Sequence, residues 1–179
     1  MQPRPTPTVT QLRRLGHAVL PAPRRVEPAG GSVQVTGDWP IRLDGVAPDD
    51  PAVTMLRQAA AEELDLHLTL EEGRSGPGIR LVVRGTGSFS VGQAGRAADS
   101  QADPDGKDPC PPSPQGYRLT LSAEGVEVAA GGRAGLFYGA ATLAQLLAGD
   151  GRVGRLPAGT VTDWPEYPLR IVHWDTKHH

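Results

Sequence analysis

The sequence has few aromatic residues, one cysteine and no long apolar run. Phe, Trp and Tyr make up 4% of the 179 residues, and Cys110 is the single cysteine. One cysteine excludes an intrachain disulfide, and its surroundings in DPCPPSP contain no base that would activate a catalytic thiol. No stretch approaches the ~20 consecutive apolar residues that a membrane-spanning helix needs.

Common catalytic and cofactor motifs are also missing. The sequence contains no G-x-S-x-G, no C-x-x-C and no Gly-rich phosphate loop. Glu62-Glu63 and Glu71-Glu72 are paired acids, which we interpret as solvated faces because charged side chains are rarely buried. His67 has no second ligand-type residue at a useful spacing. We therefore expect no cofactor and no metal site.

Charge is distributed unevenly along the chain. Five arginines precede the first acidic residue, Glu27: Arg4, Arg13, Arg14, Arg24 and Arg25. With a net charge of -2 overall, these five positive charges leave -7 for the remainder. No aromatic or helical pattern accompanies them, so we interpret this region as solvated and expect neither a nucleic-acid nor a membrane partner. No signal peptide is visible, which predicts a cytoplasmic protein if the N-terminus is native.

The clearest pattern begins at Tyr117. Residues 117–122 and 126–130 each alternate between apolar and polar side chains, as strands with one buried face do. Between them, Gly125 stands in a short turn where a positive φ is needed. The pattern predicts a β-hairpin.

A helical pattern follows the hairpin after Gly131-Gly132. Apolar residues recur at spacings of four, three and four, with Phe137 and Ala144 widening the stripe: Leu136, Ala140, Leu143 and Leu147. Gly135 and Gly139 lower helix propensity by roughly 1 kcal/mol each, but they leave no side chain to hold the helix off the strands. We predict a helix packed directly on the sheet.

The first half of the chain predicts three short strands and a second helix. Residues 32–36, 41–43 and 79–83 have strand patterns, and 66–70 also alternates with period two. Asp50 is a suitable N-cap for a helix that starts at Pro51. Strands and helices intermixed with a hairpin predict an α+β fold, with a mostly antiparallel sheet and two helices packed on one face.

Two segments carry a resemblance to a known family. AGLFYGAATLAQLL and LPAGTVTDWPEYPLR resemble the end of the non-catalytic domain that precedes the barrel in glycoside hydrolase family 20, the β-N-acetylhexosaminidases. Seven residues match the family's helix pattern G-x-x-x-G-x-x-T-L-x-Q-L-L: Gly135, Gly139, Thr142, Leu143, Gln145, Leu146 and Leu147. Four match the following x-D-x-P-x-[FY]-x-x-R pattern: Asp163, Pro165, Tyr167 and Arg170.

The resemblance implies a domain organisation. We expect a disordered leader at 1–19, a hexosaminidase-like N-terminal domain (domain 2) at 20–164 with a mobile loop at 92–113, and the start of a truncated (β/α)8 catalytic barrel at 165–179. A barrel of roughly 250 residues would not fit in the remaining length. The expected partner is the barrel of the same parent chain, which would bring the carbohydrate substrate.

The resemblance also implies site residues and a missing catalytic pair. Arg170 and Asp175 match substrate-binding positions, where a guanidinium can bond two adjacent sugar hydroxyls. The family's catalytic Asp-Glu dipeptide does not occur in this sequence. We therefore predict no catalytic residue in this chain and no hydrolase activity of its own, so that its role is to support the barrel. After Asp175 the chain departs from the family pattern, with His178 where arginine is expected.

Three other interpretations concern the aromatic residues and the C-terminal segment. A stand-alone carbohydrate-binding or protein-interaction module would use Trp39, Trp164 or Trp174. A metal site would use HWDTKHH, with ligands at His173, Asp175, His178 and His179. We also expect self-association through the exposed strand from Ile171 to Trp174, because an unpaired edge is a template for another copy.

Overall fold

The structure, a computed structural model, describes residues 18–36, 39–73, 76–84, 113–148 and 154–167. These residues form seven strands and two helices: β1 (Arg25–Gln34), β2 (Pro40–Asp44), α2 (Pro51–Leu64), β3 (Thr69–Leu70), β4 (Ile79–Val83), β5 (Tyr117–Ser122), β6 (Gly125–Ala130), α3 (Arg133–Ala148) and β7 (Arg155–Asp163). In this part of the chain, neither helix is long and apolar enough to span a membrane.

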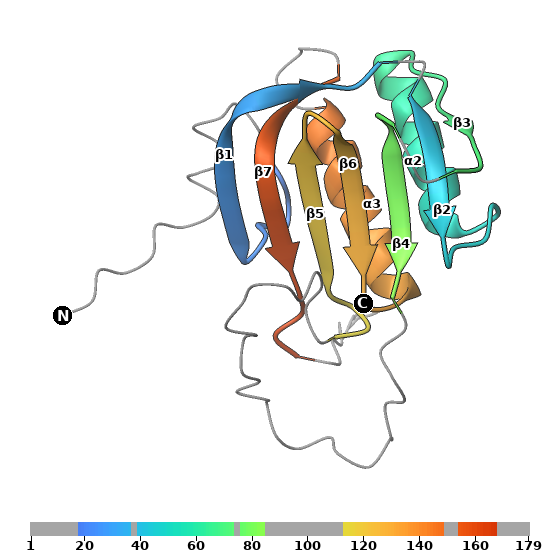
Figure 1. Ribbon diagram of the computed structural model, residues 1–179. Helices are drawn as coiled ribbons and strands as arrows, with labels where there is room; N and C mark the ends of the chain where they lie inside the picture. The colour runs from blue at the N-terminus through green and yellow to red at the C-terminus, as the bar shows by residue number, and fades with distance from the viewer. Residues whose placement is uncertain (1–17, 37–38, 74–75, 85–112, 149–153, 168–179) are drawn as a thin grey trace, which may run out of the picture.

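The strands form one mixed sheet in the order β1-β7-β5-β6-β4-β2-β3 (Figure 1). The pairs β1–β7, β7–β5 and β5–β6 are antiparallel, whereas β6–β4, β4–β2 and β2–β3 are parallel. The prediction of a mostly antiparallel sheet is therefore wrong. Helix α2 connects β2 to its parallel neighbour β3, because a helical crossover returns the chain in the same direction as the strand that it left.

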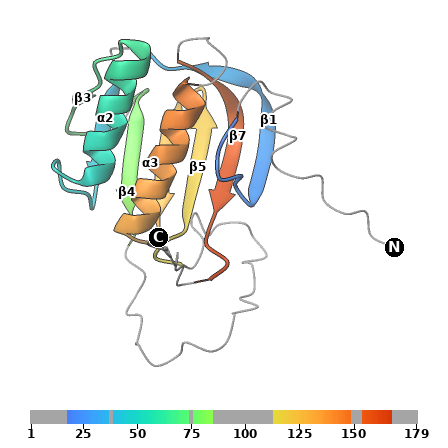
Figure 2. The same cartoon turned by 180° about the vertical axis from the view of Figure 1, so that it is seen from behind.

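Both helices lie on one face of the sheet, α3 over its middle and α2 beside it (Figure 2). The side chains between the sheet and the helices form one core that includes Ile41, Leu81, Leu119, Leu136 and Leu143, each fully buried. The opposite face carries charged and hydroxyl-bearing residues such as Arg42, Arg80 and Glu127, together with the buried Val82 and Ala129. The described part of the domain thus has a helix layer on one side and a mostly polar sheet face on the other (Figure 2).

Helix α2 begins as the sequence predicts. Asp50 has an extended backbone and its side chain accepts a hydrogen bond from the Ala52 amide, while Pro51 occupies the first turn. The other carboxylate oxygen of Asp50, which is buried, lies 2.9 Å from Nε of Arg133. The cap of α2 is therefore also tied to the first residue of α3.

The predicted hairpin, the strand at 79–83 and both helices are confirmed, but two strands differ in length. β1 starts at Arg25, seven residues before the predicted strand, because these residues pair with β7. The sequence pattern does not show this, since Glu27, Pro28 and two glycines interrupt any alternation of apolar and polar residues. Of the alternating residues 66–70, only Thr69–Leu70 form a strand, although Leu66 and Leu68 are buried. Of the predicted barrel segment 165–179, only 165–167 are described, and they are not in a strand.

Helix α3 lies very close to the sheet at two glycines. A Cβ atom on Gly139 would lie 2.5 Å from Cγ1 of Val128 and 3.1 Å from the ring of Tyr117. A Cβ atom on Gly135 would collide with the carbonyl oxygen of Gly116. The absence of a side chain at these positions therefore sets the distance between the helix and the sheet.

A buried hydrogen bond joins β5 to the same helix. The hydroxyls of Tyr117 and Thr142 are 2.7 Å apart, and both residues are buried. Burial raises the pKa of Tyr117 far above its ordinary value of 10.0; the hydrogen bond with Thr142 opposes this shift and the charge of Asp163 adds to it. Tyr117 is thus held in its neutral form between the two layers.

Gly139→Ala tests the close approach of α3. Helix propensity alone would favour alanine by about 1 kcal/mol, whereas overpacking a core costs about 1–3 kcal/mol. Because the new methyl group would overlap Val128, we expect a net loss of unfolding free energy in urea titration. Ala141→Gly, on the half-exposed side of α3, measures the propensity term alone. Stabilisation by Gly139→Ala would contradict the packing described here.

Tyr117→Phe tests the buried hydroxyl pair. At neutral pH the Thr142 hydroxyl loses its partner, and we expect a cost of about 1–2 kcal/mol. The folded state holds the Tyr117 proton more tightly than the unfolded state, so the native protein should lose stability as pH rises above about 10. This loss should be smaller in Tyr117→Phe and unchanged in the exposed control Tyr138→Phe. Equal pH dependence in Tyr117→Phe and the native protein would refute the assignment.

Candidate functional site

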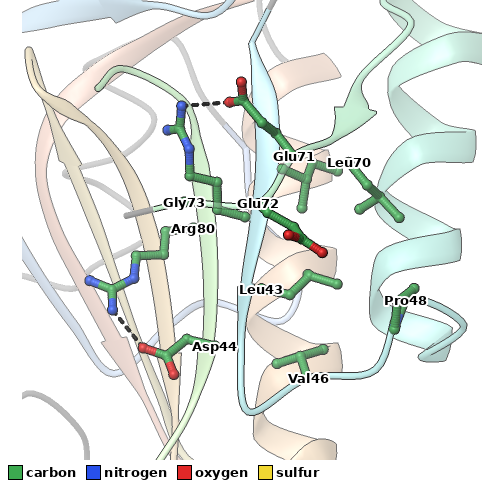
Figure 3. Close-up of a pocket in the computed structure, with 11 residues that line it drawn as sticks. Leu43, Asp44, Val46, Pro48, Leu70, Glu71, Glu72, Gly73 and Arg80 are labelled. Carbon is green, nitrogen blue, oxygen red and sulfur yellow. Dashed lines mark hydrogen bonds and ion pairs between the residues drawn. The ribbon is translucent and has the colours of Figure 1, made fainter. Parts of the chain in front are cut away.

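A charged cavity of about 590 Å³ lies at the β2–β3 edge of the sheet (Figure 3). Leu43, Val46 and Pro48 contribute apolar side chains on the side of α2, and Asp44 and Arg80 lie across β2 on the open face of the sheet. This arrangement follows from strand alternation, which sends Leu43 and Asp44 to opposite faces.

The arginines of this cavity are held in ion pairs. Nη2 of Arg80 lies 2.6 Å from the Asp44 carboxylate, and its Nη1 lies 3.3 Å from that of Glu127. Nη2 of Arg42 lies 2.8 Å from the Glu71 carboxylate, while its Nη1 donates to the carbonyl oxygens of Gly76 and Pro77. These pairs neutralise most of the charge and join β2, β4 and β6 across the open face.

The lining of the cavity does not provide a catalytic arrangement. It contains no Ser, Thr, Cys, His or Lys that could act as a nucleophile or base. The carboxylates of Asp44 and Glu71 are already bound by arginine. In the described residues, no group of three or more His, Cys, Asp and Glu is arranged to hold a metal ion. We interpret the cavity as part of the ion-pair network that stabilises the sheet edge.

A second candidate is the outer face of α3, which we define by Ala134, Phe137, Tyr138, Ala141 and Gln145. Phe137 is 38% exposed and Tyr138 46% exposed, and their rings meet edge to face with centroids 6.4 Å apart. After Arg133, the helix contains no charged residue. A helix that is uncharged all round is normally covered on all sides, yet this face is exposed in the domain.

The segment before β1 extends this apolar surface. The Leu20 amide donates to Oε1 of Gln145 at 2.8 Å, and Nε2 of Gln145 donates back to the Leu20 carbonyl at 3.0 Å. Val19 is buried in the core, whereas Leu20 is 69% exposed. The entering chain therefore lies against α3 and presents Leu20 beside the outer face of the helix.

Helix α2 shows the contrasting pattern. Its exposed side carries the polar and charged residues Thr54, Arg57, Gln58, Glu62 and Glu63. Such a face is stable in water without a partner. Of the two helices, only α3 therefore has an exposed face that favours burial against another surface.

The predicted site residues fall largely outside the described residues. Arg170 and Asp175 both do, as do Trp174, the strand from Ile171 to Trp174 and the histidines of the alternative metal site. These assignments stay predictions.

Both described tryptophans make contacts within the domain. Trp39 packs against the core, and the Trp164 ring is covered by the Arg24 guanidinium, 5.3 Å from the ring centroid.

Two features were missed from the sequence. The sequence pattern places Phe137 in the buried stripe, whereas in the structure this residue is 38% exposed; its position next to Leu136, 100° round the helix, is the signal that indicates this. The sequence pattern places Arg24 in a solvated region, whereas in the structure it contacts a residue about 140 positions later in the chain. No local pattern could have revealed that contact.

Comparisons with known proteins agree on one family. Residues 16–164 match the family described as "Glycosyl hydrolase family 20, domain 2". The N-acetyl-beta-hexosaminidase of Streptomyces plicatus is similar with a TM-score of 0.60 and 27% identity, over 93% of this chain and 28% of that chain. A beta-hexosaminidase of Akkermansia muciniphila is 46% identical over 66 residues, which are 35% of this chain and 13% of that protein.

A more distant structure shows the same fold. The GH20 exo beta-N-acetylglucosaminidase from Vibrio harveyi has a TM-score of 0.61 at 17% identity, over 94% of this chain and 21% of that chain. In each of these comparisons the chain spans 28% or less of the relative's length. The similarity is therefore to one domain of larger proteins.

Proposed function

Because the chain belongs to glycosyl hydrolase family 20 through its domain 2, we propose that it is the non-catalytic N-terminal domain of a β-N-acetylhexosaminidase-like enzyme. In this proposal its function is structural. It supports a catalytic barrel of the same parent protein, which hydrolyses terminal N-acetylhexosamine residues.

The exposure of the outer face of α3 supports the proposal most directly. This face is apolar and uncharged, its two aromatic rings are exposed, and Leu20 extends it. Burial of such a surface against a second domain would be favourable by about 25 cal/mol for each Å² of apolar area removed from water. The paired charges on the opposite face of the sheet favour contact with solvent instead. The proposal therefore assigns the helix layer to the barrel and the open sheet to water.

The similarity to larger enzymes supports the same assignment. The chain matches 28% of the Streptomyces plicatus chain, which leaves most of that chain for other domains. A fold alone does not establish a reaction, so the sugar specificity is inferred from the names of the relatives. Arg170 and Asp175 remain the proposed sugar contacts, in which the arginine would bond adjacent hydroxyls.

The double variant Phe137→Ser and Tyr138→Ser tests the docking face. In the isolated 179-residue chain we expect little loss of stability, since both rings are partly exposed. In the protein that also carries the catalytic barrel, we expect the melting temperature to fall by several °C, because central aromatic residues of an interface often contribute about 2 kcal/mol or more. Residual hydrolysis of a chromogenic N-acetyl-β-glucosaminide after heating would report the same loss.

The matched control is Thr54→Ser with Gln58→Ser on the exposed side of α2. It changes two surface residues of the other helix and should leave both proteins unaltered. If the α3 variant and this control behaved alike in the longer protein, the docking face would be wrong. If the longer protein had no hexosaminidase activity before mutation, the proposed function itself would be wrong.

A further inference from the structure

Arg24 makes four contacts with Asp163, the last residue of β7, and with the segment that follows it, residues 164–167, which we call the exit segment. Its amide donates to Oδ1 of Asp163 at 3.2 Å, and its Nε donates to the Trp164 carbonyl at 2.9 Å. Its Nη2 lies 3.4 Å from the Glu166 carboxylate. Its guanidinium also stacks over the Trp164 ring at 5.3 Å. One residue thus contacts Asp163, Trp164 and Glu166, along the path by which the chain leaves the domain.

These contacts begin where the backbone pairing of the sheet stops. β1 and β7 pair as far as Arg25 with Thr162, at the end of the sheet where β1 starts and β7 finishes (Figure 1). Arg24 is the next residue outward. Its planar guanidinium offers donors in a fixed fork together with a flat face for stacking, so it can hold a carbonyl, a carboxylate and a ring at once.

The exit segment has few other attachments. Within the described part of the chain, the side-chain hydrogen bonds and ion pairs that reach residues 164–167 all come from Arg24. Trp164 is 37% exposed and Tyr167 is 66% exposed, so the domain does not bury these rings. Pro165 restricts the backbone of Trp164 to extended conformations. The position of the segment therefore depends on one arginine acting on a stiffened chain.

The neighbouring Arg25 shows that the contacts with the exit segment depend on the position of Arg24 and not only on its charge. Arg25 pairs with Glu27 on its own strand at 2.7 Å, and both side chains are more than half exposed. Exposed ion pairs contribute little to global stability. Several weak contacts gathered on one short segment are better suited to fixing its direction than to stabilising the fold.

We propose that Arg24 is a positioning residue that fixes the path of the exit segment and thereby sets the orientation of the domain that follows. The role of Arg24 in orienting a following domain rests on the proposed function, since it needs a second domain after β7. Its role in fixing the path of the exit segment concerns the 179-residue chain alone, so the two roles are tested separately.

Backbone NMR order parameters of the 179-residue chain test the path. In Arg24→Ala we expect the order parameters of Trp164, Glu166 and Tyr167 to fall below about 0.6, the range of flexible backbone, while those of α3 stay at about 0.85. Arg24→Lys keeps the charge but loses the fork and should be intermediate. Arg25→Ala is the matched control and should leave the order parameters as in the native chain. Unchanged order parameters of the exit segment in Arg24→Ala would overturn the proposal.

Small-angle X-ray scattering of the protein that carries the catalytic barrel tests the orientation. Arg24→Ala should broaden the distribution of distances between the two domains, and Arg25→Ala should not. If the order parameters of the exit segment fall but the distances between the domains stay the same, Arg24 fixes the exit segment only and the claim about orientation fails. If the longer protein has no hexosaminidase activity, the proposed function fails, while the order parameters still decide the role of Arg24.

Discussion

The two layers of this domain depend on the close approach of α3 to the sheet at Gly135 and Gly139. A side chain at either glycine would meet Gly116 or Val128, so the helix could not keep its distance from β5 and β6. The approach brings Thr142 to the buried Tyr117 hydroxyl. It also brings Arg133 to the cap of α2. The position of α3 therefore fixes both the core and the second helix.

The same helix explains the asymmetry of the molecule. Its inner side is buried on the sheet, while its outer side, which is equally free of charge, stays exposed. The opposite face of the domain contains arginines and acids that neutralise one another between strands. We propose that the apolar face is the side for a partner and that the exit segment held by Arg24 directs the chain onward from the same domain.

The sequence predicted the elements whose evidence is local. The hairpin at 117–130, the Asp50 cap and the α3 stripe all follow from short-range periodicity and turn residues, and the resemblance to domain 2 of family 20, carried by the α3 motif, is confirmed. Parallel pairing was missed because it joins strands far apart in sequence, although the helix between β2 and β4 was a usable signal. β1 lacks any alternation, so only its partner β7 defines it. Arg24 acts over about 140 residues, and Arg170 and Asp175 still depend on the family resemblance.

We propose that this chain is one supporting domain of a larger enzyme. The most direct test is the size of the native protein in its source cells, detected with an antibody raised against the 179-residue chain. We expect a band several times heavier than the 18.8 kDa of the chain, with N-acetylhexosaminidase activity in the immunoprecipitate. A band at 18.8 kDa, without that activity, would contradict it.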